Sequence, residues 1–343
     1  LYDPSEGYYR RRDLTRWGRA GDYRTSPERS RLFAATFARY FAKLYEELCA
    51  PSAWTILEAG AGAGHFAAGV LETLKRSDPA VFSATRYVID EISSDARERA
   101  RHRLSPFGAQ VEYGHLTEIE DPISDLLIFS NELLDALPVH RVRMLDGKLF
   151  ELGIGLSATG AFCWVELEPS TPRLAIHFER ASVPPADGQV VEVNLEAEDW
   201  LRRAAAIIKR GYLVTVDYGA EESELFGAPH RRDGTLRAFH RHQFANEILE
   251  RPGELDLTTT LNWTHIQRVG EELGLQTVRL ERQDKFLLRE GALDELERMT
   301  AQAQSEAEAV ILRSSAREMI LPAGMGASFQ VLVQRKIAGK DHT

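Results

Sequence analysis

Two hydrophobic spacings alternate along the first 130 residues. Apolar positions three and four apart predict helices, here over 26–49, 66–74 and 93–104. Short runs rich in Val, Ile, Leu and Phe predict buried strands, here over 54–58, 86–90, 110–113 and 125–130. Ser26 can cap the first helix, and Pro27 suits its first turn. Strands that alternate with helices in this way predict an α/β fold with a parallel, doubly wound sheet.

From about residue 139 the pattern changes to short alternating runs separated by Gly and Pro. Runs such as 148–152 and 162–166 predict antiparallel hairpins inserted into the α/β core. A helix over 195–210 and a buried strand over 212–217 then return the chain to the main sheet, and 219–260 is loop-rich. The last elements are expected to be helices over 263–274, 291–300 and 304–319 and strands over 276–281 and 327–334.

These elements predict one large domain with insertions. The expected parts are an N-terminal lid and helix over 1–50, a core over 51–138 and 194–343 with a loop-rich insertion over 219–262, and an inserted β-hairpin subdomain over 139–193. A chain of 343 residues is long enough for such a core, because single cores stop growing near about 250 to 300 residues.

Composition narrows the class of protein. The chain has 42 Lys and Arg against 52 Asp and Glu, a net charge of −10, which opposes attraction to a polyanion. We therefore expect its arginine-rich stretches, near 10–24 and 231–241, to be solvated loops rather than a nucleic-acid surface. No apolar run of about 18 residues is present, so we expect no membrane segment and a cytoplasmic protein. Cys49 and Cys163 lie in no motif with metal spacing, so we expect buried, reduced thiols and no metal site.

A glycine-rich turn follows the first predicted strand. Residues 56–64 read Ile-Leu-Glu-Ala-Gly-Ala-Gly-Ala-Gly, and Gly60, Gly62 and Gly64 would let a ligand approach the backbone closely. From Gly62 onward the run also satisfies the dinucleotide pattern G-x-G-x-x-A, which would hold a pyrophosphate at the helix start. Glu58 decides between the ligands, because a carboxylate would repel a pyrophosphate but would attract the aminoacyl end of S-adenosylmethionine. A glycine turn without a ligand is the third interpretation.

Two acids follow the second predicted strand. A bound nucleoside needs a carboxylate there, because carboxylate oxygens accept hydrogen bonds from the ribose hydroxyls. We assign this role to Glu91 and keep Asp90 as the fallback. Gly114, His115 and Leu116, after the third strand, are expected to cover the adenine, and the alternative for His115 is an ordinary loop residue.

Three polar residues follow the fourth predicted strand. Asn131, Glu132 and Asp135 lie where open α/β sheets bind ligands, and a helical turn starting there would place them on one face. The alternative is an ordinary helix start, with Asn131 as the N-cap and the two acids near the positive end of the helix dipole.

With these motifs the chain resembles the MidA-like methyltransferases, the bacterial relatives of the mitochondrial complex I assembly-factor arginine methyltransferase. The matching motifs are Leu1-Tyr2-Asp3-Pro4 with Gly7-Tyr8-Tyr9, Gly21-Asp22-Tyr23 with Thr25-Ser26-Pro27-Glu28, the glycine turn, Asn131-Glu132 with Asp135-Ala136-Leu137-Pro138, Asp217-Tyr218-Gly219, Gly234-Thr235-Leu236, and Pro252-Gly253 with Asp256-Leu257-Thr258. They span nearly the whole chain. The resemblance implies a Rossmann-like class I methyltransferase fold with inserted β-hairpins and extra helices, S-adenosylmethionine as cofactor and a protein arginine as acceptor.

The resemblance also suggests a role for each motif. The glycines, Glu58 and Glu91 would hold the cofactor, while Glu132 and Asp135 would grip a guanidinium that Asn131 helps to orient. The segment over 21–28, which contains Asp22 and Thr25, would fold over the cofactor as a lid. Asp217 and Tyr218 would line the pocket from the fifth strand.

One stretch departs from the family pattern. Members usually read D-[IL]-T-A-H-V-D-F, whereas residues 256–263 read Asp-Leu-Thr-Thr-Thr-Leu-Asn-Trp, so that Thr260 and Asn262 replace a histidine and an aspartate. A cofactor-binding assembly factor with little catalysis is therefore the second hypothesis. A nicotinamide-dependent oxidoreductase is the third, and Glu58 disfavours it.

Overall fold

The computed structural model describes residues 1–3, 5–11, 25–240, 243–245 and 247–337. The chain forms two compact units, which we name the sheet unit and the insertion unit. The sheet unit comprises Arg24–Leu133, Arg203–Asp217 and Gly270–Thr343. The insertion unit comprises Leu1–Tyr23, Leu134–Arg202 and Tyr218–Val269.

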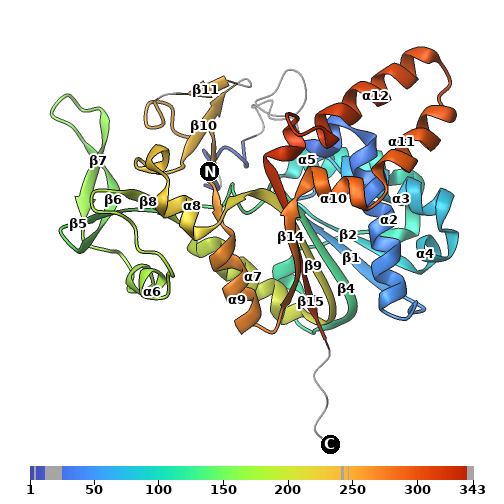
Figure 1. Cartoon of the computed structure of the whole chain (residues 1–343), viewed down its shortest axis with the longest axis horizontal. Helices are drawn as coiled ribbons and strands as arrows, with labels where there is room; N and C mark the ends of the chain where they lie inside the picture. Colours follow the sequence, from blue (N-terminus) through green and yellow to red (C-terminus); the bar gives the residue numbers. More distant parts are fainter. Residues whose placement is uncertain (4, 12–24, 241–242, 246, 338–343) are drawn as a thin grey trace, which may run out of the picture. The chain divides into compact units, whose positions relative to one another are not determined.

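The sheet unit is built on a mostly parallel sheet (Figure 1). Its strands lie in the order β14-β15-β9-β4-β1-β2-β3. The bounds are β1 Trp54–Ala59, β2 Thr85–Asp90, β3 Val111–Tyr113, β4 Ile123–Asn131, β9 Ile208–Ala220, β14 Gln276–Arg282 and β15 Phe329–Lys336. The neighbouring strands β3, β2, β1, β4 and β9 pair in parallel, whereas β14 and β15 pair antiparallel to each other. Every residue of β1 is buried, as expected of a central strand covered on both faces. The predicted α/β class with a parallel sheet is confirmed.

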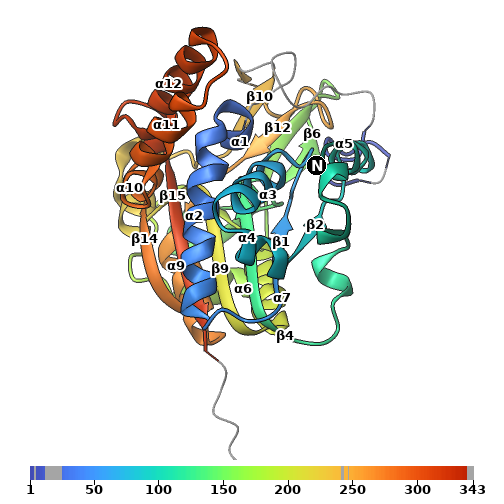
Figure 2. The same ribbon diagram turned by 90° about the vertical axis from the view of Figure 1, so that its right-hand side faces the viewer.

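Helices surround this sheet, and Figure 2 shows α2 running in front of the strands with α3 beside it. The helices of the sheet unit are α1 Ser26–Arg29, α2 Arg31–Glu47, α3 His65–Ser77, α4 Pro79–Ala84, α5 Ser94–Leu104, α10 Gln283–Arg289, α11 Ala292–Ala301 and α12 Glu306–Ile320. Two more helices, α7 Leu195–Ile207 and α9 Trp263–Glu272, continue from the insertion unit into the sheet unit. The hydrophobic spacing did not predict the short helices α4 and α10.

The single helix predicted over 26–49 is wrong in two respects. Ser30 is extended, with φ of −145°, and therefore separates α1 from α2. The N-cap residue of α1 is Thr25 rather than Ser26, and Ser26 is the first helical residue. Pro27 does lie in the first turn, where its missing N–H costs no helical hydrogen bond.

An aromatic cluster joins α2 and α3 to the sheet. Phe37 of α2 contacts Phe66 of α3, Phe129 of β4 and Phe286 of α10, with ring centroids 5.0 to 5.8 Å apart. Phe66 and Phe129 are stacked nearly parallel, 4.1 Å apart at 8°. Because all four rings are fully or almost fully buried, the cluster is a main part of the core of this unit.

The insertion unit contains two antiparallel sheets. The larger has the order β7-β6-β5-β8, and the smaller has the order β11-β10-β12. Their bounds are β5 His140–Leu145, β6 Lys148–Leu156, β7 Phe162–Leu167, β8 Val190–Val193, β10 Arg237–His240, β11 Gln243–Ala245 and β12 Asp256–Thr258. The predicted hairpins are therefore present, with helix α6 Arg173–Glu179 between β7 and β8.

The stretch predicted as loop-rich, 219–260, holds more structure than expected. It contains α8 Glu222–Gly227 and the whole β11-β10-β12 sheet. A further short strand, β13 Leu261–Asn262, pairs in parallel with the end of β9. These elements were missed because their strands are only two to four residues long and carry no alternation that a sequence pattern can detect.

The two cysteines are not buried as predicted. Cys49 is exposed, Cys163 is partly exposed, and both are free thiols. Cys49 follows the end of α2, where the chain turns with a φ of 66°. Within the described residues, no helix has both the length and the apolar character needed to cross a bilayer.

The aromatic cluster predicts a specific loss of stability. Phe37→Ala should lower the free energy of unfolding by about 3 to 5 kcal/mol, because it leaves a cavity among three other rings. Urea unfolding followed by circular dichroism measures this as a lower midpoint. Phe244→Ala is the control: its ring is 67% exposed, so its effect should stay within about 0.5 kcal/mol. Equal losses in both variants would contradict the role of the cluster.

Candidate active site

The glycine turn joins β1 to α3 and has the backbone that glycine permits. Gly60, Gly62 and Gly64 have φ of 68°, 54° and 74°, all in the left-handed region. A Cβ at Gly60 would lie 3.0 Å from Leu133 Cδ1, and one at Gly64 would lie 3.2 Å from Ala100 Cβ. Side chains at these positions would therefore strain the backbone and also meet neighbouring atoms.

Glu58, the acid before the turn, is buried. Its Oε2 accepts a hydrogen bond of 2.6 Å from the hydroxyl of Tyr87 on β2. Burial raises the pKa of Glu58 to about 8, and nearby Glu91 acts in the same direction. Tyr87 was not predicted as a site residue. In the parallel register Glu58 lies opposite Ile89, and Tyr87, two residues before Ile89 on β2, shares the same face of the sheet.

The two acids after β2 reach different loops. Glu91 accepts hydrogen bonds of 2.7 Å from the N–H of Gly62 and from the N–H of Ser93. Asp90 instead accepts from the N–H of Leu116, at 3.0 Å, and pairs with His115 at 2.8 Å. The structure thus brings Glu91 to the glycine turn, whereas the side chain of Asp90 is engaged by the loop after β3.

Arg97 and His115 complete this side of the site. Arg97 donates two hydrogen bonds to the carbonyl of Glu91, and its Nη2 lies 3.1 Å from His115 Nε2. A guanidinium can only donate, so His115 Nε2 accepts and Nδ1–H donates to Asp90. His115 therefore has a definite partner on each nitrogen and does more than fill a loop.

The remaining residues predicted for the cofactor are less constrained. Leu116 is buried, but a Cβ at Gly114 would meet no atom within 4 Å, so packing does not require glycine there. The carbonyl of Thr25 accepts hydrogen bonds from the first turn of α1. Asp22 lies outside the described residues, and so does the rest of the first half of the predicted lid, residues 21–24. Contacts of these residues with a cofactor stay predictions.

The chain after β4 does not form the predicted helical turn. Glu132 has a φ of 53°, and its N–H donates to the carbonyl of Val216 on β9 at 2.9 Å. The shared helical face of Glu132 and Asp135 is therefore wrong, and so is the alternative of Asn131 as a helix N-cap. A left-handed conformation is uncommon for a glutamate and is found preferentially at functional sites.

The carboxylate of Glu132 is held within the sheet unit. Its Oε1 accepts a hydrogen bond of 3.0 Å from Asn131 Nδ2 and one of 3.4 Å from the N–H of Ser26. Asn131 Oδ1 and the buried hydroxyls of Ser26 and Ser130 have no hydrogen-bond partner among the described residues. Buried polar atoms without partners are rare, and a ligand is one explanation for such a group.

The other predicted pocket residues divide between the units. Asp217, at the end of the sheet-unit part of β9, is fully buried. In the insertion unit, Asp135 is 3% exposed, and Tyr218 lies under the guanidinium of Arg237 at 5.3 Å. Their roles toward an acceptor stay predictions.

One of the two departures from the family pattern, Asn262, has a local structural explanation, and the contacts of Thr260 give none. Asn262 Oδ1 accepts a hydrogen bond from the N–H of His265 and so caps α9, while its Nδ2 donates to the buried Glu222 at 3.2 Å. An aspartate would also cap the helix but would place a second carboxylate beside Glu222. Thr260 is held through its N–H by the hydroxyl of Thr235.

The sheet unit thus combines a turn with three glycines, two acids beside it and buried polar atoms that have no hydrogen-bond partner in the described part of the chain. A glycine cradle admits a nucleoside ligand, and Glu58 and Glu91 suit its ammonium group and its ribose. These residues fit S-adenosylmethionine. Together with the strand order, they define a Rossmann-like S-adenosylmethionine-dependent methyltransferase.

Comparison with known proteins agrees with this class. A family model described as "Putative S-adenosyl-L-methionine-dependent methyltransferase" matches residues 36–280. The chain belongs to this family, the MidA-like methyltransferases, and S-adenosylmethionine is its cofactor. A crystal structure from Burkholderia thailandensis, bound to S-adenosyl-homocysteine, superimposes with a TM-score of 0.85 at 27% identity, covering 99% of this chain and 86% of that one.

Two named relatives are mitochondrial proteins. "Protein arginine methyltransferase NDUFAF7 homolog, mitochondrial" of Drosophila melanogaster is 28% identical, covering 97% of this chain and 78% of that protein. "Protein arginine methyltransferase NDUFAF7, mitochondrial" of Rattus norvegicus is 23% identical, covering 79% of this chain and 64% of that protein. The chain thus spans less than two thirds of the rat relative.

The burial of Glu58 predicts a pH dependence of stability. Its pKa rises from an ordinary 4.5 to about 8 in the folded protein. As the pH rises between these values, the unfolded chain has released a proton that the folded chain retains, so Glu58 makes the folded state progressively less stable. Glu58→Gln removes this titration. Calorimetry across the window should show Tm of the variant rising relative to wild type with pH, and a constant difference would contradict the raised pKa.

Proposed function

We propose that this protein transfers a methyl group from S-adenosylmethionine to an arginine side chain of a partner protein. The observation that carries the proposal is the loop after β4, where Glu132 has an uncommon left-handed backbone. The side chain of Asn131 and the N–H of Ser26 both donate to the carboxylate of Glu132. Asp135 follows three residues later. The names of the Drosophila and rat relatives support an arginine acceptor.

The cofactor half of the mechanism uses the residues around the glycine turn. Glu58 engages the aminoacyl end of the cofactor, and Glu91 accepts hydrogen bonds from the ribose while it supports the N–H of Gly62. The cofactor supplies a methyl group on a positively charged sulfur, which is already activated for displacement. The protein therefore contributes mainly alignment of the acceptor and handling of its proton.

The acceptor half uses acids because the acceptor is a cation. A guanidinium has a pKa above about 12, so it stays protonated at neutral pH, and it presents N–H groups in a fixed planar fork. Glu132 and Asp135 accept those N–H groups and leave one nitrogen directed at the methyl carbon, and Asn131 helps to orient it. As the new N–C bond forms and the S–C bond breaks, the acceptor nitrogen gives up one proton, which a neighbouring carboxylate can accept.

The most direct test identifies the acceptor. The protein is incubated with methyl-labelled S-adenosylmethionine and a lysate of its host, and labelled peptides are mapped by mass spectrometry. Label on arginine supports the proposal. Label confined to another residue type would exclude arginine as the acceptor.

Cofactor binding should distinguish Glu91 from Asp90. Glu91→Ala should weaken S-adenosylhomocysteine binding by roughly 1.5 to 3 kcal/mol, about tenfold to 150-fold, because it loses hydrogen bonds to a charged group. Asp90→Ala should have a smaller effect, because Asp90 is engaged by His115 and Leu116. Titration calorimetry on both variants measures this. The reverse order would move the ribose contact to Asp90.

Glu132→Gln should separate chemistry from cofactor binding. The variant keeps the size of the side chain but loses the charge, so its affinity for S-adenosylhomocysteine should barely change. Methyl transfer to arginine should fall by two decades or more, as expected from roughly 3 to 5 kcal/mol for removing one partner of a desolvated charge pair. Full transfer activity in a folded Glu132→Gln protein would remove Glu132 from the acceptor site.

A further inference from the structure

Three successive carbonyl groups of the loop after β4 are held from outside the loop. Within the insertion unit, the carbonyl of Leu134 accepts a hydrogen bond of 2.7 Å from Asn194 Nδ2. The carbonyl of Asp135 accepts from both the N–H and the hydroxyl of Thr259, at 3.0 and 3.3 Å. The carbonyl of Ala136 accepts from the hydroxyl of Tyr2 at 3.3 Å. The donors lie 60, 124 and 134 residues away from these carbonyls in sequence.

Asn194 serves two purposes at once. Its Oδ1 accepts from the N–H of Ala197 at 2.8 Å, which caps the first turn of α7, and its amide group donates to the loop. Only an amide side chain offers an acceptor and a donor in this arrangement. An aspartate at this position would keep the cap and lose the donor.

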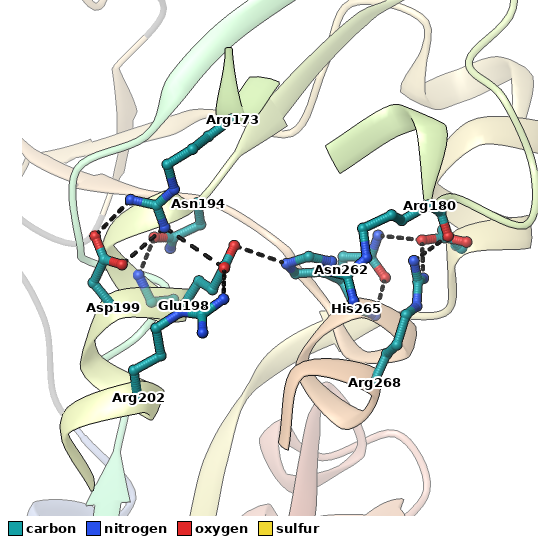
Figure 3. Close-up of polar contacts among 11 residues, drawn as sticks. Arg173, Arg180, Asn194, Glu198, Asp199, Arg202, Asn262, His265 and Arg268 are labelled. Atoms are coloured by element: carbon teal, nitrogen blue, oxygen red, sulfur yellow. Dashed lines mark hydrogen bonds and ion pairs between the residues drawn. The ribbon is translucent and has the colours of Figure 1, made fainter. Parts of the chain in front are cut away.

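The helix that Asn194 caps is fixed by ion pairs (Figure 3). Arg173 of α6 forms two hydrogen bonds of 2.8 Å with Asp199, and Arg202 pairs with Glu198 at 2.5 Å. Glu198 also lies 3.5 Å from Nε2 of His265 on α9. The neighbouring His265 and Arg202 lower the pKa of Glu198 to about 2, so its carboxylate stays ionised at neutral pH.

The donor Thr259 is fixed in the same network. It lies shortly before α9, whose first turn Asn262 caps while donating to Glu222. Arg268 of the same helix pairs with Glu222 at 2.8 Å and also donates to the carbonyl of Arg180 (Figure 3). The segments that carry Asn194 and Thr259 are therefore linked to one another through α7 and α9.

The N-terminal donor is anchored a second time. Tyr2 and Tyr9 are stacked at 5.2 Å, and the hydroxyl of Tyr9 donates to Asp256 of β12 at 2.6 Å. Asp256 precedes Thr259 by three residues. The first segment of the chain and the β12 segment thus support each other where both reach the loop.

We propose that Asn194, Thr259 and Tyr2 are positioning residues of the methyl-transfer site, which hold three carbonyls of residues 134–136 and thereby fix the direction of the Asp135 side chain. The inference rests on the proposed function, because Asp135 matters only as an acceptor-binding carboxylate. Asp135 is 3% exposed, so a buried acid is presented from a loop with no helix or strand of its own. The external hydrogen bonds replace the rigidity that such an element would supply.

Two matched pairs of variants test the proposal. Asn194→Asp keeps a helix cap and removes the donor to Leu134. Its control is Ser305→Asp, which also places an aspartate at a helix N-cap, here the cap of α12 in the sheet unit, where Ser305 accepts from the N–H of Glu308. Thr259→Val removes the hydroxyl at constant shape, and Thr259→Ser restores it. The measurements are the initial rate of labelling of arginine in host lysate, the affinity for S-adenosylhomocysteine, and hydrogen exchange of the amides of residues 134–137.

The proposal expects a selective pattern. Asn194→Asp and Thr259→Val should lose roughly tenfold to a hundredfold in labelling rate, since a misplacement of about 1 Å can cost that much. Both should bind S-adenosylhomocysteine as wild type does and exchange the loop amides faster. Ser305→Asp and Thr259→Ser should retain the labelling rate per folded molecule. Equal labelling in all variants, or equal losses in Asn194→Asp and Ser305→Asp, would overturn the positioning role.

Failure of the proposed function gives a different result. If wild type labels no arginine while binding S-adenosylhomocysteine, the acceptor assignment fails, and with it the role of Asp135 as a guanidinium ligand. Hydrogen exchange of the loop amides then tests only whether Asn194 and Thr259 hold the loop. Faster exchange in Asn194→Asp and Thr259→Val than in their matched controls supports a held loop, and equal exchange overturns it.

Discussion

The sheet unit depends on the stacked contact between Phe66 and Phe129, which packs α3 against β4. Phe66 lies two residues after Gly64, at the start of α3, and Phe129 lies two residues before Asn131, at the end of β4. Their rings are 4.1 Å apart and nearly parallel. One apolar contact therefore fixes the helix that follows the glycine turn against the strand that leads to Asn131 and Glu132. This packing acts together with hydrogen bonds of the site backbone itself, such as those donated by the N–H groups of Gly62 and Glu132.

The sequence predicted the features that depend on local pattern. Three local signals were sufficient for the parallel sheet and for the position of the cofactor turn. They are the short β-prone run of β1, the turn at Gly60, Gly62 and Gly64, and the alternation of strands with helices. The acid next to the turn could be identified as well. Its partner Tyr87 could not, because a contact between neighbouring strands depends on their register, and the register is set by the packing of the whole sheet.

The predictions from the sequence were wrong where groups distant in the chain determine the backbone conformation. Residues 131–135 have acceptable helical spacing, but the carbonyl of Val216 takes the N–H of Glu132 and leaves that residue at a φ of 53°. Ser30 is extended in the middle of an otherwise helical pattern. Asn194 carried no signal in the sequence, because its hydrogen-bond partner, the carbonyl of Leu134, is 60 positions earlier in the chain. Local propensity is a weak prior where tertiary hydrogen bonds compete with it.

The strand order of the insertion unit has a consequence for handling the protein. β7 is an edge strand, and its sequence Phe-Cys-Trp-Val-Glu-Leu contains Glu166 as its one charged residue. Phe162 and Leu167, at its two ends, are 50% and 52% exposed. Native edges are usually protected by several charges, by proline or by a bulge, and a flat apolar edge is a template for pairing with another strand. Glu166, held by Arg143 at 2.7 Å, is thus the main barrier on this strand to aggregation at high concentration.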